Sequence, residues 1–335
     1  YEVNMTGSAE FRTGKGVLIS YDDGRLVWKK ALRPHFTNPI SPFSSRTVFV
    51  PYNKEMALVT WVKGDLFRAQ DCKTGDDLWN RPACQFPVKV KGFVAGYCFR
   101  ALHLLDPKSG RPRYKYPLKK DVVELFALGD GVLLLHRAGE ISFVELPGGK
   151  VHELEKRPNI KHAAVVGGRA FLLYKEGYRL ILEMLTAQKP SLYQGPVKSS
   201  WKISLSLFPT TFWVHVQDDA VILPTGLDCM MSRTLASGTE LWTSCGVYLF
   251  NPPAYDEFGM YMLSSRERDG VRPILFVDGD NGLQTNLFQT NASGSVNSLS
   301  GKFIAPGRIR HGMIYAIHKS EKVVGIRIAA PETKE

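Results

Sequence analysis

The chain of 335 residues carries 43 Lys and Arg against 32 Asp and Glu, and its hydrophobic fraction of 44% is ordinary for a globular protein. No apolar run approaches the roughly 18–20 residues of a membrane helix, and a chain this long can bury a core without a disulfide or a metal ion. The net charge of +11 favours an acidic protein surface, a nucleic acid or an anionic lipid as partner, or else gives a solvated basic surface.

Short runs rich in Val, Ile, Leu, Phe and Tyr recur along the chain, separated by Gly, Asp, Asn, Ser and Pro, and helical periodicity is nearly absent. This pattern predicts many short strands, as in a sandwich, a barrel or a propeller. In chain order, the first predicted strands are 16–21 and 26–31, followed by a group of four at 47–52, 56–62, 66–70 and 78–81. Two more groups of four follow, at 122–128, 131–136, 141–146 and 151–154, and at 160–166, 169–175, 178–185 and 191–195. The last predicted strands are 303–306, 312–319 and 322–329.

One unit recurs within this pattern: an apolar strand, a turn with Gly, and a strand whose aromatic residue follows the Gly by four positions. The clear copies end at Trp28, Trp79, Tyr114 and Trp242. A fixed offset between a turn Gly and an aromatic residue indicates a hairpin, because the turn sets the strand register. Weaker copies place His152, Tyr193 and Asn286 in the aromatic position. The mean step between copies, about 43 residues, fits one four-stranded propeller blade.

The [Thr/Ser]-Gly-x-x-x-Trp copies resemble the tryptophan-docking repeat of pyrroloquinoline-quinone (PQQ) propellers, most strongly at Trp79 and Trp242. In that family the Trp of the last strand stacks on a peptide of the next blade. The family's Asp, three residues before the Thr or Ser, stands at Asp71 and Asp106. In the Trp242 copy, Thr234 replaces it.

The resemblance implies an all-β protein in which residues 1–335 form one β-propeller domain. We expect about seven four-stranded blades. The strand at 322–329 would belong to a blade completed by sequence before Ala31, so that the N- and C-terminal strands pair and close the ring. A count of eight blades results if residues 3–7 form the closing strand.

Catalytic motifs are missing from the sequence. The PQQ enzymes that the repeat resembles bind the cofactor and a Ca²⁺ ion in a central funnel, use a catalytic Asp and commonly have a vicinal Cys pair, and no two Cys are adjacent here. The eight His form no HxH or HExxH motif, and no G-x-S-x-G turn occurs. Residues 278–282 resemble the start of a calcium loop, but Leu283 and Gln289 stand where the loop needs Gly and Glu. We therefore predict no enzyme activity, no cofactor and no metal ion.

The five Cys include no CxxC pair, which argues against a zinc site. Buried free thiols are the favoured interpretation. The alternative is cross-strand disulfides at Cys72–Cys84 and Cys229–Cys245. The sequence does not set the compartment, although the family resemblance favours an extracytoplasmic one, periplasmic or secreted.

The leading functional hypothesis is a non-catalytic scaffold that binds protein partners through loops on one face, as non-enzymatic relatives of the repeat do. The long loops are predicted at residues 32–46, 195–202 and 251–258. The last loop has two prolines and carries Tyr255 and Phe258, and large aromatic residues often anchor interfaces.

The main alternative is a propeller that binds a polyanion or nucleic acid through its basic surface. Residues 111–116 read Arg-Pro-Arg-Tyr-Lys-Tyr, so Arg111, Arg113 and Lys115 are interleaved with aromatic rings, a pattern that suits a nucleic-acid strand. The same pattern also suits an exposed strand face. A quinoprotein-like enzyme is the third and least favoured hypothesis.

Overall fold

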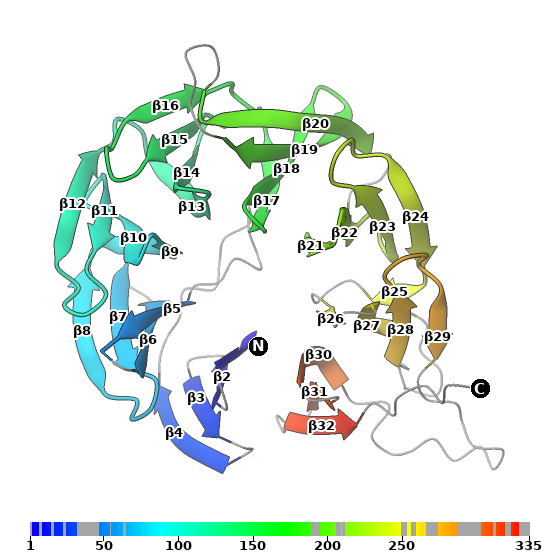
Figure 1. Cartoon of the computed structure of the whole chain (residues 1–335), viewed down its shortest axis with the longest axis horizontal. Helices are drawn as coiled ribbons and strands as arrows, with labels where there is room; N and C mark the ends of the chain where they lie inside the picture. The colour runs from blue at the N-terminus through cyan, green and yellow to red at the C-terminus, as the bar shows by residue number, and fades with distance from the viewer. Residues whose placement is uncertain are drawn as a thin grey trace. The chain divides into compact units, whose positions relative to one another are not determined.

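Every described secondary-structure element of the computed structural model is a strand (Figure 1). The structure describes residues 2–6, 9–14, 17–22, 25–31, 47–53, 55–62, 65–188, 195–205, 209, 212–248, 253–255, 259–265, 274–286, 303–310, 313–318 and 323–327. For the first four and the last three strands it describes the backbone alone. Within this described part of the chain, no helix has the length and hydrophobicity to cross a membrane.

The strands form eight antiparallel sheets, six of which contain four consecutive strands. The first two sheets are β1 (Glu2–Thr6), β2 (Ala9–Gly14), β3 (Val17–Asp22) and β4 (Arg25–Ala31), and β5 (Thr47–Tyr52), β6 (Glu55–Val62), β7 (Leu66–Asp71) and β8 (Asp77–Pro82). The next two are β9 (Cys84–Val90), β10 (Phe93–Cys98), β11 (Ala101–Leu105) and β12 (Pro112–Pro117), and β13 (Val122–Leu128), β14 (Gly131–His136), β15 (Ile141–Glu145) and β16 (Val151–Leu154). The fifth and sixth are β17 (Ile160–Val166), β18 (Arg169–Glu176), β19 (Arg179–Ala187) and β20 (Val197–Leu205), and β21 (His215–Gln217), β22 (Ala220–Pro224), β23 (Cys229–Thr234) and β24 (Glu240–Cys245).

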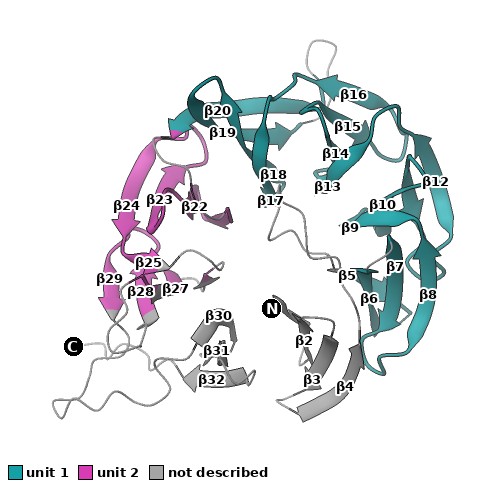
Figure 2. Ribbon diagram, turned by 180° about the vertical axis from the view of Figure 1, so that it is seen from behind, with its two compact units in different colours: residues 1–204 teal, residues 205–335 magenta. Residues whose placement is uncertain are grey.

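The seventh sheet has five strands and the eighth has three. They are β25 (Val247–Tyr248), β26 (Ala254–Tyr255), β27 (Gly259–Ser264), β28 (Ile274–Asp278) and β29 (Gln284–Asn286), and then β30 (Phe303–Arg310), β31 (Met313–His318) and β32 (Val323–Arg327). The chain divides into two compact units, residues 1–204 and residues 205–335 (Figure 2).

Unit 1 buries its apolar side chains between successive sheets. The first strands of consecutive sheets are in contact, β5 with β9, β9 with β13 and β13 with β17. Leu133 and Leu134 are neighbours in β14 but belong to different apolar clusters, because successive side chains of a strand point to opposite faces. Both faces of such a middle strand are covered, so its sequence is a continuous apolar run and not an alternating one.

The outermost strands carry their aromatic residues in one shared register. Trp28 lies opposite Ser20, Trp79 opposite Ala69, Tyr114 opposite Leu104 and Trp242 opposite Ser232. In each pair the register shifts directly beyond this position, so the residue before the aromatic is a bulge residue. The predicted equivalence of these four copies is confirmed. Tyr193 lies outside the described residues.

Of the three aromatic residues whose side chains the structure describes, two contact the turn of the following sheet. The Trp79 indole N–H donates to the Pro107 carbonyl oxygen at 2.8 Å, and the Trp242 indole N–H donates to the Gly279 carbonyl oxygen at 3.0 Å. The predicted packing of Trp79 and Trp242 on the neighbouring blade is therefore confirmed.

Tyr114 differs from this pattern and corrects the prediction. Its side chain is 41% exposed, and it stacks on Tyr116 with 6.3 Å between ring centroids. Tyr116, two residues further along the same strand face, contacts the next turn. Its hydroxyl donates to the Pro147 carbonyl, and its ring covers Gly149. The phenol that reaches the next turn thus comes from Tyr116.

The last strand of the fifth sheet also differs from the prediction. β20 spans Val197–Leu205, so most of the predicted loop at 195–202 is strand. The strand predicted at 191–195 falls mainly outside the described residues. β20 carries a buried aromatic residue, Trp201, which lies 6.2 Å from Phe171 between ring centroids.

The described strands form eight sheets, the larger of the two predicted blade counts, but β1 belongs to a four-stranded sheet with β2, β3 and β4 and was predicted to be the closing strand. In the pairing of the described strands, β1 pairs with β2 and β32 pairs with β31. Pairing between the two ends of the chain stays a prediction, as does the single domain spanning residues 1–335.

Four of the five cysteines form disulfides, which corrects the favoured expectation of free thiols. Cys229 and Cys245 are bonded across β23 and β24, as the alternative proposed. Cys84 is bonded to Cys98, its register partner in β10, and not to Cys72. Cys72 is buried and is not disulfide-bonded, and burial raises its pKa to about 12, which makes it a poor nucleophile.

Candidate partner-binding surfaces

Tyr255 lies in unit 2, in β26, and its side chain is 52% exposed. β25 and β26 both pair with β27. Pro253 directly precedes β26, and a proline has no N–H to donate to a strand ladder.

The exposed ring of Tyr255 rests on a buried imidazole. The ring centroids of Tyr255 and His215 are 3.9 Å apart, with 37° between the ring planes. His215 belongs to β21 and is 8% exposed, and burial lowers its pKa, so the imidazole is neutral at neutral pH. Its Nε2 atom is buried and has no hydrogen-bond partner in the described part of the chain.

This pair gives the surface a fixed aromatic ring. A large ring that is supported from below loses little conformational freedom when a partner covers it, which is the property of residues that anchor interfaces. Tyr255 is therefore a suitable anchor for a protein partner. Phe258, the other predicted residue of this loop, lies outside the described residues.

Arg111, Arg113 and Lys115 are all exposed on or beside β12, but they do not act as one stripe. Arg113 is the bulge residue of this copy, and its guanidinium donates two hydrogen bonds to Oδ2 of Asp106, at 2.8 and 3.1 Å. These bonds lower the pKa of Asp106. The Arg113 charge is therefore paired, whereas Lys115 lies opposite His103.

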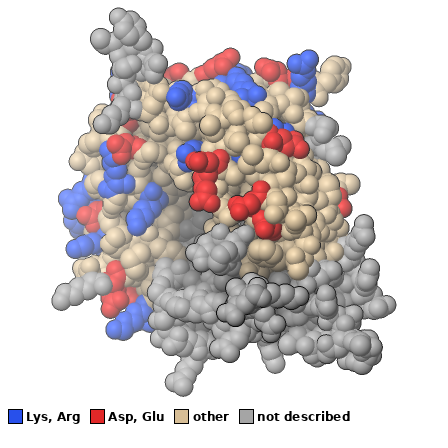
Figure 3. All heavy atoms as spheres, turned by 45° about the vertical axis from the view of Figure 1, so that its right-hand side comes forward, with Lys and Arg blue, Asp and Glu red and all other residues tan. Residues whose placement is uncertain are grey.

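Figure 3 shows the charged side chains on one face of the molecule. Among its described residues, basic and acidic side chains lie beside one another and no basic area covers the face. An extended polyanion such as a single-stranded nucleic acid needs a row of unpaired positive charges along its binding surface. The predicted nucleic-acid surface is not assembled by these three residues.

The calcium-like segment 278–282 is a structural turn. Oδ1 of Asp278 accepts hydrogen bonds from the backbone N–H groups of Asp280 and Asn281, at 2.8 and 3.2 Å. Asp71 and Asp106 cap their turns in the same way, so the acidic residue belongs to the repeat. The Asp278 carboxylate thus caps the turn of this copy as Asp71 and Asp106 cap theirs.

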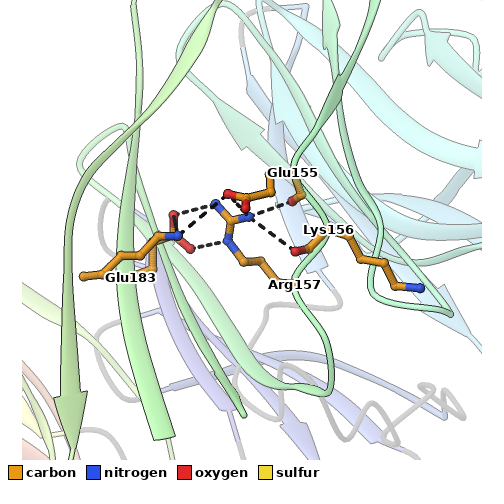
Figure 4. A network of polar contacts seen from close by, with 5 residues as sticks. Glu155, Lys156, Arg157 and Glu183 are labelled. Atoms are coloured by element: carbon orange, nitrogen blue, oxygen red, sulfur yellow. Dashed lines mark hydrogen bonds and ion pairs between the residues drawn. The ribbon is translucent and has the colours of Figure 1, made fainter. Parts of the chain in front are cut away.

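Among the described residues of unit 1, the most buried charged group is Glu183, which Arg157 holds in an ion pair (Figure 4). Burial opposes ionisation of Glu183, but hydrogen bonds from Arg157 prevail and lower the pKa of this carboxyl. Arg157 also donates to the Glu155 carboxylate at 2.8 Å, and Lys202 lies 3.8 Å from both acids. Two acids and two bases balance each other, so the network fixes the segment after β16 against β19 and leaves no free base for chemistry.

No family model and no curated protein matches the sequence. Solved structures do match. BamB from Moraxella catarrhalis superposes with a TM-score of 0.59 at 13% identity, over 96% of this chain and 94% of that one. The dihydro-heme d1 dehydrogenase NirN, in complex with DHE, gives a TM-score of 0.58 at 10% identity, over 96% and 74%. BBS1N in complex with ARL6DN gives 0.50 at 15% identity, over 89% and 95%.

The chain folds as a β-propeller. The identities, 10–15%, show the fold alone. They include both an enzyme and a protein complexed with another protein, so the propeller does not decide the function.

Sequence reasoning found Tyr255 but missed two histidines, His215 and His103. His215 and Tyr255 are 40 positions apart in different sheets, and no spacing rule connects them. No sequence motif distinguishes His103, although it lies opposite Lys115 in the basic stretch. The apolar strand around each His was the available signal, because a His in such a strand is buried and loses its charge.

Proposed function

We propose that this protein is a non-catalytic propeller scaffold that binds a protein partner, with Tyr255 as an anchor residue. The supporting observation is the exposed Tyr255 ring, fixed 3.9 Å from the buried His215 ring. A propeller with a solved protein complex, BBS1N with ARL6DN, makes partner binding a known use of a similar fold.

We also propose that the protein has no catalytic activity. This proposal is supported by the lack of a vicinal Cys pair in the sequence and by the engagement of the Asp278 carboxylate in its own turn. The indole contacts of Trp79 and Trp242 with the following turns favour a place among the PQQ-type propellers, and the missing Cys pair favours their non-enzymatic branch.

We also propose that the protein matures in an oxidising compartment, outside the cytoplasm. Two disulfides cross adjacent strands, and disulfides persist in secreted and periplasmic proteins but are rare in the cytosol.

Affinity purification with mass spectrometry tests the scaffold proposal. Wild-type protein is compared with Tyr255→Ala and with Tyr178→Ala, the control, because Tyr178 is a fully exposed tyrosine in the turn after β18. We expect a specific partner that is lost with Tyr255→Ala and retained with Tyr178→Ala. Equal recovery by all three proteins removes Tyr255 from the interface. Turnover of an alcohol in the presence of PQQ and Ca²⁺ overturns the non-enzyme proposal.

A further inference from the structure

Three basic side chains of unit 1, Arg81, His103 and Lys115, lie together without an acidic partner. His103 is 3% exposed, and its Nδ1 atom has no hydrogen-bond partner in the described structure. The Nε atom of Arg81 is also buried and without a partner. Neither Arg81 nor Lys115 forms an ion pair with any described residue. We call these three residues the basic cluster.

The strand order brings the cluster together. Lys115 in β12 is the register partner of His103 in β11. Arg81 in β8 follows Trp79 by two positions and so shares its strand face, and this face contacts the next sheet at Pro107. The end of β8 lies directly beside the β10–β11 turn.

The electrostatics agree with this placement. Burial, together with the charges of Arg81 and Lys115, lowers the pKa of His103 to about 4. His103 is therefore neutral at neutral pH, and two uncompensated positive charges flank it. A buried polar atom without a partner is unusual, because its desolvation is not repaid by a hydrogen bond.

Four other basic residues in this part of unit 1 are paired with acids. Ion pairs join Lys91 to Asp130, Arg100 to Asp121, Arg113 to Asp106 and Lys120 to Glu153. The cluster itself offers two positive charges, which suits one carboxylate better than a long polyanion, because a polyanion gains affinity from many paired phosphates.

An exposed apolar ring adjoins the cluster. Phe99 is 63% exposed, and its ring centroid is 6.5 Å from that of His103. The Phe99 N–H donates to the Ala83 carbonyl oxygen at 3.2 Å, which holds the turn against the end of β8. The buried Cys84–Cys98 disulfide lies at the base of the same turn. The ring is thus presented on a fixed support.

We propose that the basic cluster binds the carboxylate of an acidic side chain on a protein partner, and that Phe99 packs on the apolar residue beside that side chain. The Arg81 guanidinium supplies directed donors and Lys115 supplies charge, while the neutral, buried His103 does not compensate either charge. This inference rests on the proposed function, because it gives the chemistry of one segment of the partner.

Titration with synthetic peptides tests the inference on the full chain. The probes are acetyl-Gly-Leu-Glu-Leu-Gly-amide and its Gln counterpart, with inorganic phosphate and a single-stranded oligonucleotide as competitors. Binding is followed through the His103 imidazole and Phe99 ring resonances. The variants are Arg81→Gln and Lys115→Gln, and the control is Arg111→Gln, which removes an exposed charge from the start of the same strand.

We expect the Glu peptide to bind wild type and Arg111→Gln about equally, with at least about tenfold weaker binding of the Gln peptide. Each cluster variant should weaken the Glu peptide about fivefold or more. Lys115 is exposed, so its replacement keeps the test valid if Arg81→Gln unfolds. Three results overturn the inference: no binding of the Glu peptide, an equal loss with Arg111→Gln, or stronger binding of the oligonucleotide or phosphate than of the peptide.

Partner capture separates this inference from the proposed function. If a partner is lost with Tyr255→Ala but retained with Arg81→Gln and Lys115→Gln, the scaffold proposal stands and the cluster proposal fails. If the cluster binds the Glu peptide but no protein partner is captured, the chemistry of the cluster stands and the scaffold proposal fails.

Discussion

Trp79 covers Gly110: a Cβ atom added to this glycine would lie 2.5 Å from the indole ring. Gly282 has the same relationship to Trp242, where the added Cβ would lie 2.6 Å from the ring. Both glycines have a positive φ, +65° and +72°, which any other residue adopts only with strain. The turn glycine of the repeat is therefore required twice, by the backbone conformation and by the aromatic residue of the preceding sheet.

Gly110→Ala should lower the free energy of unfolding by about 2–4 kcal/mol, because it combines backbone strain with a steric clash on the Trp79 ring. Gly92→Ala is the matched control, since Gly92 has a φ of +78° but an added Cβ there meets no atom within 4 Å. We expect the control to cost only about 1 kcal/mol. Urea denaturation of both variants measures the difference. Equal losses would show that the contact with Trp79 adds nothing to the strain.

The sequence alone predicts the strands and the aromatic positions of the repeat, but not the positions at which the structure departs from it. The strands between residues 122 and 154 match the prediction closely, because each apolar run is bounded by Gly, Pro or charged residues. The Gly-to-aromatic offset also places Trp79 and Trp242 correctly. It fails to distinguish Tyr114 from Tyr116, since both lie on one face of β12 and only the packing decides which ring reaches the next turn.

Contacts between residues far apart in the sequence were harder to predict than the repeat. The Cys84–Cys98 disulfide depends on the register of β9 and β10, which contains an irregularity between Ala95 and Tyr97. A bulge shifts the register without a clear sequence signal, so comparing repeat positions pointed to Cys72 and not to Cys98. The stacking of Tyr255 on His215 likewise depends on how two sheets pack.

Thiol counting checks the disulfide assignment. The denatured, unreduced protein should expose one reactive thiol, that of Cys72, and the reduced protein should expose all five. Replacing both Cys84 and Cys98 by Ala should cost about 3 kcal/mol of stability, because the bond closes a loop of 14 residues and restricts the unfolded chain. Cys72→Ala is the control, since it removes a thiol and no crosslink. More than one free thiol before reduction would contradict the pairing.

Stability should fall as the pH drops from about 6.5 to about 4. The pKa of His103 is about 4 in the folded protein and 6.5 in the unfolded chain, so the unfolded state binds more protons in this window. His136 and His215 also have lowered pKa values, caused mainly by burial, and add to the loss. Each histidine contributes a slope of up to about 1.4 kcal/mol per pH unit.

His103→Gln tests this assignment, because it keeps a polar side chain without a titrating group. Urea denaturation at several pH values between 7 and 4 should give a smaller loss of stability for the variant than for the wild type. His152→Gln is the control, as His152 pairs with Glu145 at 3.1 Å and is not deeply buried. A pH profile unchanged by His103→Gln would mean that His103 is protonated in the folded protein or exposed to solvent.

Removing one partner of the buried Arg157–Glu183 ion pair should destabilise the protein more than replacing both partners by apolar residues. Glu183 is fully buried, and Arg157 donates to both of its carboxylate oxygens. Arg157→Met removes these donors and leaves a buried carboxylate, for which the expected cost is about 3–5 kcal/mol. Lys202, at 3.8 Å, is too far to replace the lost hydrogen bonds.

The double variant Arg157→Met with Glu183→Leu should be more stable than Arg157→Met alone, because no charge then remains without a partner. This follows from the high desolvation cost of the pair, which apolar side chains of similar volume avoid. A double-mutant cycle by urea denaturation gives the coupling energy between the two residues. Additive losses would show that water reaches Glu183 in the single variant and that the carboxylate is not confined as its burial indicates.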